Sequence, residues 1–228
     1  MGTISNHQPY DGYLASVFCA VGKIAPTPQT VTIGATAPEK GDTTVILSAS
    51  ASAPMDAGNF LLFRDTNGLE YLVEIATDYS TGTTLNVVAL DADIPAGATA
   101  HFPPEIMDRT EVNLDRSYNT DSFTTLNTGG QSVVKPTTTD KTISVPGFYH
   151  HYNAGYHTAA KAAEAKKAVW LREEFPAPDA RYSKGKVVQG LAVVTSRPEN
   201  NPSDGYHTAD LELSFTGNTV ETPATPVA

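Results

Sequence analysis

The stretch TADLELSF, residues 208–215, carries the pattern that decides the fold of this chain. Apolar and polar residues alternate along it, with Ala209, Leu211, Leu213 and Phe215 on one side and Asp210, Glu212 and Ser214 on the other. Successive side chains of a β-strand point to opposite faces of a sheet, so this alternation predicts a strand with one buried and one polar face.

The segments around this strand show related patterns. Strands are predicted at residues 13–21, 142–145, 168–175 and 186–196. Residues 109–118 alternate as well, with Val112 and Leu114 on one face and Glu111, Asn113 and Asp115 on the other. One helix is predicted from Asn153 or Ala154 to about Lys167, because alanines fill it and allow close packing on a sheet. The chain is therefore expected to be mainly β with one flanking α-helix.

Residues 28–103, called the insert below, form a compact β unit with an internal repeat. The first copy runs from TTVIL at residues 43–47 through Pro54 to Phe63, and the second from TTLNV at residues 83–87 through Pro95 to Phe102. Each copy is expected to be a strand, a Pro/Gly turn and a second strand. The repeat thus predicts a small inserted β domain.

A long polar stretch covers residues 119–139 and is rich in Thr, Ser, Asn and Gly. A loop of this length is unusual in a compact domain, so it is expected either to be disordered or to make contacts. Its candidate contact residues are Asn119, Thr125, Asn127, Gly129, Gly130 and Thr139. Residues 221–228, which contain two prolines, are expected to form a flexible C-terminal tail.

The charge of the chain argues against tight binding to nucleic acid. Twenty-five acidic and fifteen basic residues give the 228-residue chain a net charge of −10, whereas binding to phosphates needs Lys and Arg. Nine of the acids and two of the bases belong to the insert, whose net charge is −7, which leaves −3 for the rest. Most of the acidity is therefore expected to serve the solubility of the insert.

The termini and the cysteine content indicate a cytoplasmic place of synthesis. The amino terminus lacks the basic start and apolar run of a secretory signal, and no apolar segment approaches the length of a membrane span. Cys19, the single cysteine, lies in an apolar run and is expected to be buried in a strand. A soluble protein without disulfides is predicted.

Candidate chemical sites are few. His150, His151 and His157 lie close in sequence, but neighbours on a strand point to opposite faces, and no acidic residue stands among them. Asp210 and Glu212 share a strand face, as paired catalytic carboxylates would and as any solvated stripe does. No phosphate-binding loop, zinc-protease motif or nucleophile elbow occurs. We expect no enzymatic activity, no bound metal and no cofactor.

The pentapeptide GYHTA occurs twice, at residues 155–159 and 205–209. Each copy opens a predicted regular element, the first opening the helix and the second the last strand. A glycine followed by an aromatic residue and a threonine suits a turn that enters such an element. A shared active site would require the two histidines to converge in space.

From Asn113 onward the order of elements resembles that of the tail tube proteins of tailed bacteriophages. The matching order is a strand, a long polar stretch, the strand at residues 142–145, a short helix and three strands. The closing part is also similar: KVVQGLAVVTS at residues 186–196, NPSDG at 201–205, and a last strand that ends in Phe215-Thr216-Gly217. The insert resembles the small β units with TTLxV and IPAGxxxxF that many phage virion proteins contain.

The resemblance implies a β-sandwich or barrel with one flanking helix, formed by residues 1–27 and 104–220, that assembles into hexameric rings. Stacked rings would form the tail tube, through which genome DNA passes without specific binding. Further partners would be the tape measure, the terminator and, in a contractile tail, the sheath. The protein would be made in the host cytoplasm and located in the virion tail, away from any membrane.

The same resemblance implies roles for individual residues. The polar stretch would order against an adjacent subunit or ring. The candidate carboxylates of the tube wall are Glu111, Asp115, Asp210 and Glu212. Two alternatives remain: another phage virion β protein, such as a capsid decoration, adaptor or baseplate component, and a carbohydrate-binding β domain.

Overall fold

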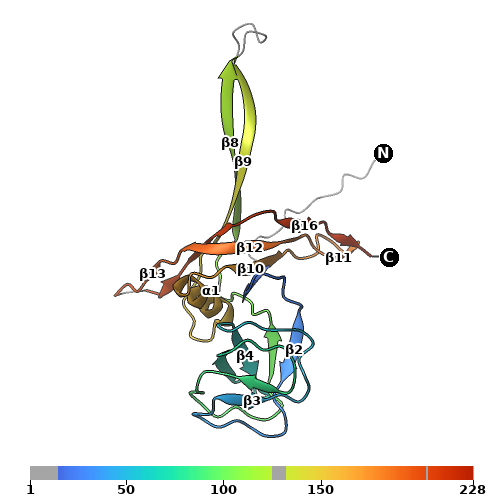
Figure 1. Ribbon diagram of the computed structural model, residues 1–228, viewed down its shortest axis with the longest axis vertical. Helices are drawn as coiled ribbons and strands as arrows, with labels where there is room; N and C mark the ends of the chain where they lie inside the picture. The colour runs from blue at the N-terminus through green and yellow to red at the C-terminus, as the bar shows by residue number, and fades with distance from the viewer. Residues whose placement is uncertain (1–14, 125–131, 204, 228) are drawn as a thin grey trace.

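The computed structural model describes residues 15–124, 132–203 and 205–227, and for residues 119–138 it describes the backbone alone. This described part holds seventeen strands and one helix, so the prediction of a mainly β fold with one flanking helix is confirmed. Three parts follow one another along the longest axis: a projecting hairpin, a broad sheet with the helix beside it, and the insert (Figure 1).

The broad sheet, called the main sheet below, is antiparallel throughout. Its strands follow the order β1 (Ser16–Val21), β10 (Val169–Glu174), β12 (Val187–Ser196), β15 (Leu211–Phe215), β9 (Ser132–Val145) and β8 (Asn113–Thr124), and β16 (Val220–Thr222) also pairs with β12. The predicted strand at residues 208–215 is divided into β14 (Thr208–Ala209) and β15. The apolar side chains of these strands lie on the sheet face that packs against the helix, as the alternation predicts.

Helix α1 (Ala154–Glu164) covers one face of the main sheet. The Asn153 side chain begins the helix by accepting a hydrogen bond from the Tyr156 N–H at 3.0 Å, a standard N-cap. Ala159 and Ala162 are almost fully buried against Val17, Leu171 and other apolar side chains of the sheet. Small side chains on the helix thus allow its close approach to the sheet.

The insert has a separate apolar core with Leu61, Phe63 and Leu85 fully buried in it. Its larger sheet has the order β2 (Gln29–Thr32), β7 (Thr99–Phe102), β4 (Phe60–Arg64) and β5 (Glu70–Glu74), while β3 (Thr44–Ile46) pairs with β6 (Thr84–Asn86). Both end strands of the larger sheet continue into bridges to the smaller one, through Ile33 with Leu47 and through Ile75 with Val87.

The sequence repeat of the insert corresponds to a repeat of hydrogen bonds. The Leu47 N–H donates to the Thr83 carbonyl at 2.7 Å, and the Val87 N–H donates to the Thr43 carbonyl at 2.9 Å. The Gly58 N–H likewise bonds to Ile75, and the Gly97 N–H to Ile33. The two copies are therefore interlocked halves that complete each other.

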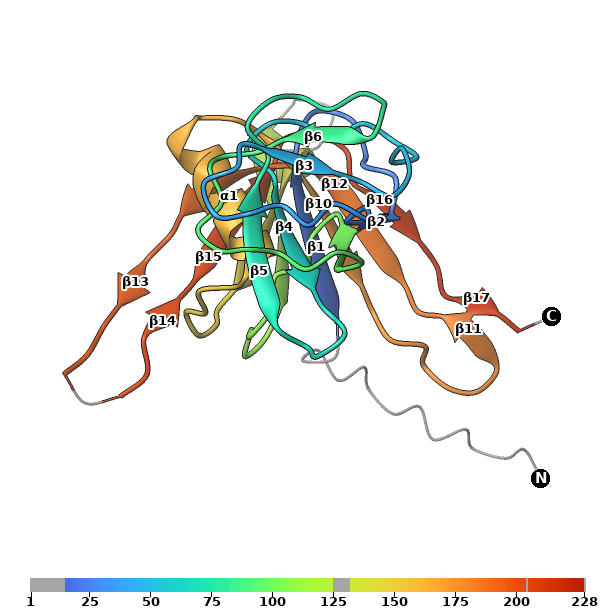
Figure 2. The same ribbon diagram turned by 90° about the horizontal axis from the view of Figure 1, so that it is seen from below.

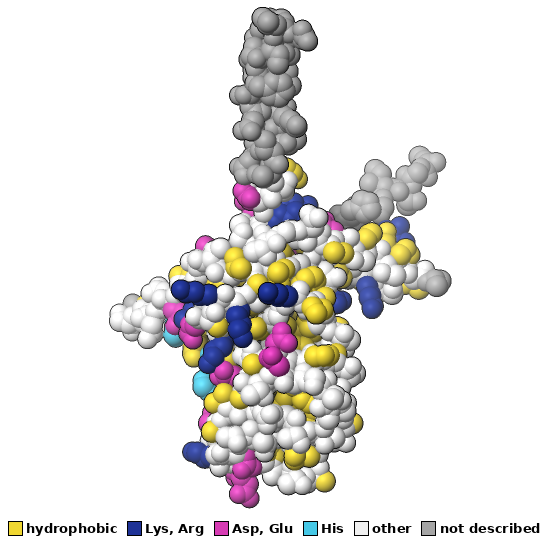
Figure 3. Space-filling model, viewed as in Figure 1, with side chains coloured by type: hydrophobic (Ala, Val, Ile, Leu, Met, Phe, Trp, Pro, Cys, Tyr) yellow, Lys and Arg dark blue, Asp and Glu magenta, His cyan; other side chains and the backbone are white. Residues whose placement is uncertain are grey.

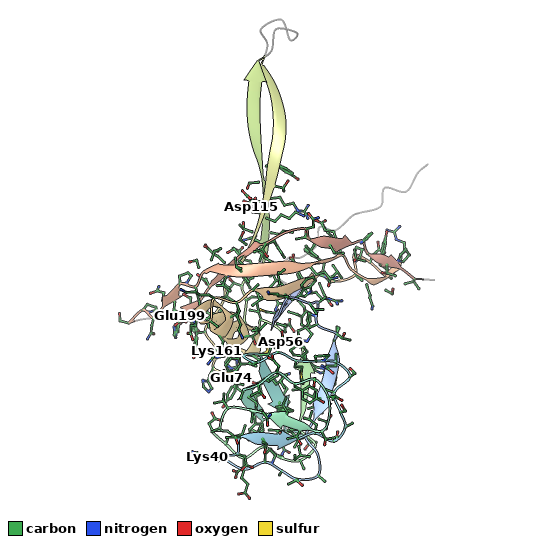
Figure 4. All side chains as sticks on the ribbon, viewed as in Figure 1. Lys40, Asp56, Glu74, Asp115, Lys161 and Glu199 are labelled. Carbon is green, nitrogen blue, oxygen red and sulfur yellow. The ribbon has the colours of Figure 1, made fainter. Side chains whose placement is uncertain are left out.

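A buried polar junction joins the insert to the rest of the chain. The Asn59 side chain, fully buried, accepts from the Val21 N–H at 2.8 Å and donates to the Val21 carbonyl at 3.3 Å. The Thr158 hydroxyl of α1 accepts from the Phe60 N–H at 2.9 Å. Lys161 of α1 pairs with Glu74 of the insert at 2.9 Å (Figure 4). These contacts fix the insert against the end of β1.

Two expectations about loops are wrong. Residues 119–139 do not form one long loop, because β8 continues to Thr124 and β9 begins at Ser132. Asn119 and Thr139 therefore lie in strands, while Thr125, Asn127, Gly129 and Gly130 lie outside the described residues. Threonine-rich segments have a high β propensity, and the ladder between these two strands outweighs their polar composition.

The C-terminal residues also form strands in place of the expected flexible tail. β16 pairs with residues 187–189 of β12, and β17 (Thr225–Pro226) pairs with β11 (Tyr182–Lys184). The two prolines do not prevent this, because edge strands tolerate proline. A further small hairpin pairs β13 (Glu199–Asn200) with β14.

Candidate functional site

The main sheet has one face without a covering helix. Opposite α1, Glu212 of β15 lies beside Ser144 of β9, which in turn lies beside Asn113 of β8. In the next row, Ser214, Thr142 and Asp115 are neighbours in the same way. Residues that are paired across strands share one face of a sheet. This half of the face is consequently polar and acidic, and we call it the polar face.

Three of the four candidate wall carboxylates lie on the polar face. Asp115 and Glu212 are exposed there, and Asp115 stands at the base of the projecting hairpin (Figure 4). Glu111 precedes β8 and accepts a hydrogen bond from Asn113 Nδ2 at 2.9 Å, which places it on the same side. Asp210 differs: it is half-buried, and its carboxylate accepts from the Gly147 N–H at 3.1 Å. Asp210 therefore supports the local backbone.

The hairpin of β8 and β9 projects from the main sheet (Figure 1). The two strands pair from Asn113 with Ser144 to Thr124 with Ser132, whereas β15 supports β9 only at residues 142–145. Beyond that support, no other described strand pairs with either of them. Nine residues of β8 past Asp115 correspond to a reach of about 30 Å. A polar two-stranded ribbon of this length is barely stable alone in water.

A network of charges holds the base of the hairpin. Glu221 of β16 pairs with Arg116 of β8 at 2.5 Å, with Lys186 at 2.9 Å and with Lys141 of β9 at 3.8 Å. The hydrogen bond from Lys186 and the surrounding cations lower the pKa of the Glu221 carboxyl. One carboxylate thus ties β16 to both strands of the hairpin.

Glu173 lies next to this network and is buried, with 2% of its surface exposed. Desolvation raises the pKa of its carboxyl to about 7, against the opposing effect of Lys186 and Arg116. Its Oε2 atom has no hydrogen-bond partner among the described residues. Sequence reasoning missed Glu173. The alternation in VWLREE could have found it, because Glu173 lies on the same side of the strand as the buried Val169 and Leu171.

The two GYHTA copies converge in space. The His207 ring stacks on Tyr149 with centroids 4.6 Å apart, and the His157 ring meets Tyr149 edge-on at 6.2 Å. Burial lowers the pKa of His157. The Tyr156 hydroxyl donates to Glu199 Oε1 at 2.5 Å, and burial raises its pKa. The repeated motif therefore builds one aromatic corner where α1 meets β14.

The other candidate ligands are engaged elsewhere or buried. His150 Nδ1 lies 3.2 Å from Asp108 Oδ2, and His157 Nε2 lies 2.9 Å from the His151 carbonyl oxygen. Within the described residues, no group of three or more His, Cys, Asp or Glu side chains is placed to hold a metal ion. Cys19 is buried, and desolvation raises the pKa of its thiol to about 12. In the same part of the chain, no helix is long and apolar enough to span a membrane.

Comparison with known proteins finds similarity only among solved structures. No family model matches the chain, and no curated protein matches it. It is similar to a chain in the virion of a native gene transfer agent particle, with 17% identity and a TM-score of 0.43, over 51% of this chain and 86% of that one. It is also similar to a chain in the C6-symmetric tail of an empty gene transfer agent particle, with 15% identity and a TM-score of 0.42, over 72% of this chain and 95% of that one.

Proposed function

We propose that this chain is a structural subunit of a phage-like tail, which self-assembles into stacked hexameric rings and forms the tube that conducts DNA. The observation that carries this proposal is the projecting hairpin of β8 and β9. Its strands have 12 and 14 residues, and outside residues 142–145 of β9 no other described strand pairs with them. In a tail, the further partners of the tube are the tape measure, the terminator and, where one exists, a sheath.

The hairpin supports self-assembly because it is incomplete in one copy. A long unpaired edge strand such as β8 is a ready template for pairing with another chain. Contacts with a neighbouring subunit or the next ring would bury both strands and supply the stability that a lone ribbon lacks. Such contacts would extend over a distance of about 30 Å along the hairpin.

The polar face supports a role as the wall of a channel for DNA. Glu111, Asp115 and Glu212 put negative charge on a sheet face that carries small polar side chains between them. Phosphates bind where Lys and Arg replace their counterions, so a face of carboxylates lets DNA slide. Asp210, whose carboxylate accepts from the Gly147 N–H, supports the conformation of this region. We therefore also propose that the chain is not an enzyme.

Electron microscopy of the concentrated, purified protein tests the proposal. Negative staining is expected to show long tubes of uniform diameter made of stacked rings with six subunits each. A stable monomer or trimer at all protein concentrations would contradict the tube and favour a decoration or adaptor protein.

The wall assignment has its own test. The triple variant Glu111→Lys, Asp115→Lys and Glu212→Lys is expected to form tubes that retain DNA, with a binding constant that falls steeply as salt rises. Reversal of three acids in the insert, Asp65→Lys, Glu70→Lys and Asp91→Lys, is the matched control. Equal DNA retention by both variants would contradict the assignment of the polar face to the channel wall.

A further inference from the structure

Two hairpin wings extend from opposite ends of the main sheet (Figure 2). The first, called the acidic wing, comprises residues 197–210 with β13 and β14. The second, called the basic wing, comprises residues 175–186 and 223–227 with β11 and β17. Strand β12 connects them, and its ten residues separate the two wing roots by about 30 Å. One molecule therefore carries two distant hairpins.

The strands of both wings are largely exposed, although the acidic wing is anchored at its root by Ala209, which is buried in the main core, and by the hydrogen bond from Tyr156 to Glu199. Both residues of β13 and both residues of β17 are exposed, as are two of the three residues of β11. Each wing pairs through only two positions of register. Two-stranded hairpins this short are marginal in water unless another surface packs on them. The wings share this incompleteness with the projecting hairpin.

The wings carry opposite charge. Among its described residues, the acidic wing holds Glu199 and Asp210 against Arg197, a net charge of −1. The basic wing holds Arg181, Lys184 and Lys186 against Asp179, a net charge of +2, which the ion pair between Lys186 and Glu221 of β16 reduces to +1. Two surfaces of opposite charge attract each other and orient the encounter between subunits.

Exposed apolar side chains accompany these charges. At the acidic wing, Tyr206 is 79% exposed and Phe148 44% exposed, and their rings meet edge-on at 5.5 Å. At the basic wing, Val227 is 56% exposed. These are three of the nine exposed large apolar side chains of the described residues. Figure 3 shows hydrophobic side chains next to Lys and Arg on the basic wing.

We propose that the acidic wing of one copy docks on the basic wing of the next copy, head to tail. Tyr206 and Phe148 pack against Val227, while the opposite charges set the orientation. Because the two surfaces are different, the contact is heterologous, and it generates a closed ring when the rotation between copies closes. This inference rests on the proposed self-assembly and adds which surfaces join the subunits within a ring.

Cysteine cross-linking between copies tests the contact. The variants Tyr206→Cys and Val227→Cys are mixed in equal amounts, left to assemble and treated with a short bismaleimide. Cys19 does not compete, because it is fully buried and its thiol stays protonated. A cross-linked dimer is expected in the mixture and neither variant alone should give one. The double variant should give a ladder of products that ends at the number of subunits in the ring.

The outcomes separate this inference from the proposed function. Tubes without a cross-link between the two variants would overturn the wing contact and leave the tube standing. If the Tyr206→Cys variant alone gave as much cross-linked dimer as the mixture, the wing contact would also be contradicted, because the contact would then be symmetric. A protein that stays monomeric would contradict both proposals.

A substitution measures the strength of the contact. Tyr206→Ala removes an aromatic anchor from the acidic wing and leaves every buried residue in place. It is expected to raise the protein concentration needed for assembly at least tenfold, as the loss of a central interface aromatic does. Leu69→Ala is the matched control, since Leu69 is 59% exposed on the insert, away from both wings. Equal effects of the two substitutions would exclude Tyr206 from the interface.

Discussion

The insert and the main sheet are both antiparallel, but they differ in whether their edge strands are paired. In the insert, both end strands of the larger sheet continue into bridges with β3 and β6. In the main sheet, β8 has a partner on one side only, and three hairpins extend beyond the body. The comparison teaches that the insert pairs its end strands within one copy, while the main sheet leaves one edge of β8 unpaired among the described strands.

Removal of the projecting hairpin is the change with the largest expected effect. Residues 119–138 are replaced by Asn-Gly, which joins Tyr118 to Thr139, two residues paired in the ladder, through a two-residue turn. Assembly is expected to stop completely, whereas the melting temperature of the monomer changes by no more than about 2 °C. Tubes formed by the shortened protein would contradict this account, because assembly would then not require the projecting hairpin.

The two cores are expected to melt separately. Phe63→Ala in the insert removes a fully buried ring and should cost about 3–5 kcal/mol of unfolding free energy, and Leu171→Ala in the main core about 2–5 kcal/mol. Calorimetry should show that each substitution lowers a different transition. A single transition lowered by both substitutions would mean that the insert is not a separate cooperative unit.

The junction should be weakened by Asn59→Ala. The substitution leaves the buried N–H and carbonyl of Val21 without their side-chain partner, which costs about 1–3 kcal/mol. Trypsin should then cut faster after Lys23, which is exposed in the segment between β1 and the insert. Asn67→Ala, in an exposed turn, is the control, and trypsin should cut this variant at the wild-type rate. Unchanged cleavage in Asn59→Ala would show that other contacts hold the junction.

The smallest expected effect is the pH dependence from Glu173. Its pKa is about 7 in the folded protein and about 4.5 when unfolded, so the folded state binds more protons between these values. Stability therefore falls as pH rises from 4.5 to 7 and stays level above that range. Glu173→Gln should stabilise the protein by about 1–2 kcal/mol at pH 8 and by almost nothing at pH 4.5. An equal effect at both pH values would mean that the stabilisation comes from packing and not from the ionisation of Glu173.

The alternation of apolar and polar residues predicts much of the main domain. It places Leu211 and Leu213 inward and Glu212 outward, and it places Glu111 and Asp115 on the face opposite Leu114, as the structure has them. These residues follow the two-residue period of a strand, which needs no knowledge of distant contacts. Helix α1 is likewise predicted by its alanines.

Features that depend on distant partners are not visible in the sequence. Polar composition predicts a loop at residues 119–139, yet two long strands pair there because each supplies the other with a ladder. The meeting of His157 and His207 at Tyr149 joins segments fifty residues apart. The buried position of Glu173 depends on its neighbouring strands β1 and β12, and this burial raises the pKa of its carboxyl.

Hydrogen exchange of the backbone amides, compared between unassembled and assembled protein, tests most directly that the hairpin is completed by other copies. In the unassembled protein, amides of β8 beyond Asp115 should exchange rapidly, while those of β2 and β7 in the insert are protected. On assembly, exchange in β8 should slow at least a hundredfold, with no change in β2 and β7. Rapid exchange of β8 in assembled protein, or full protection of β8 before assembly, would contradict this.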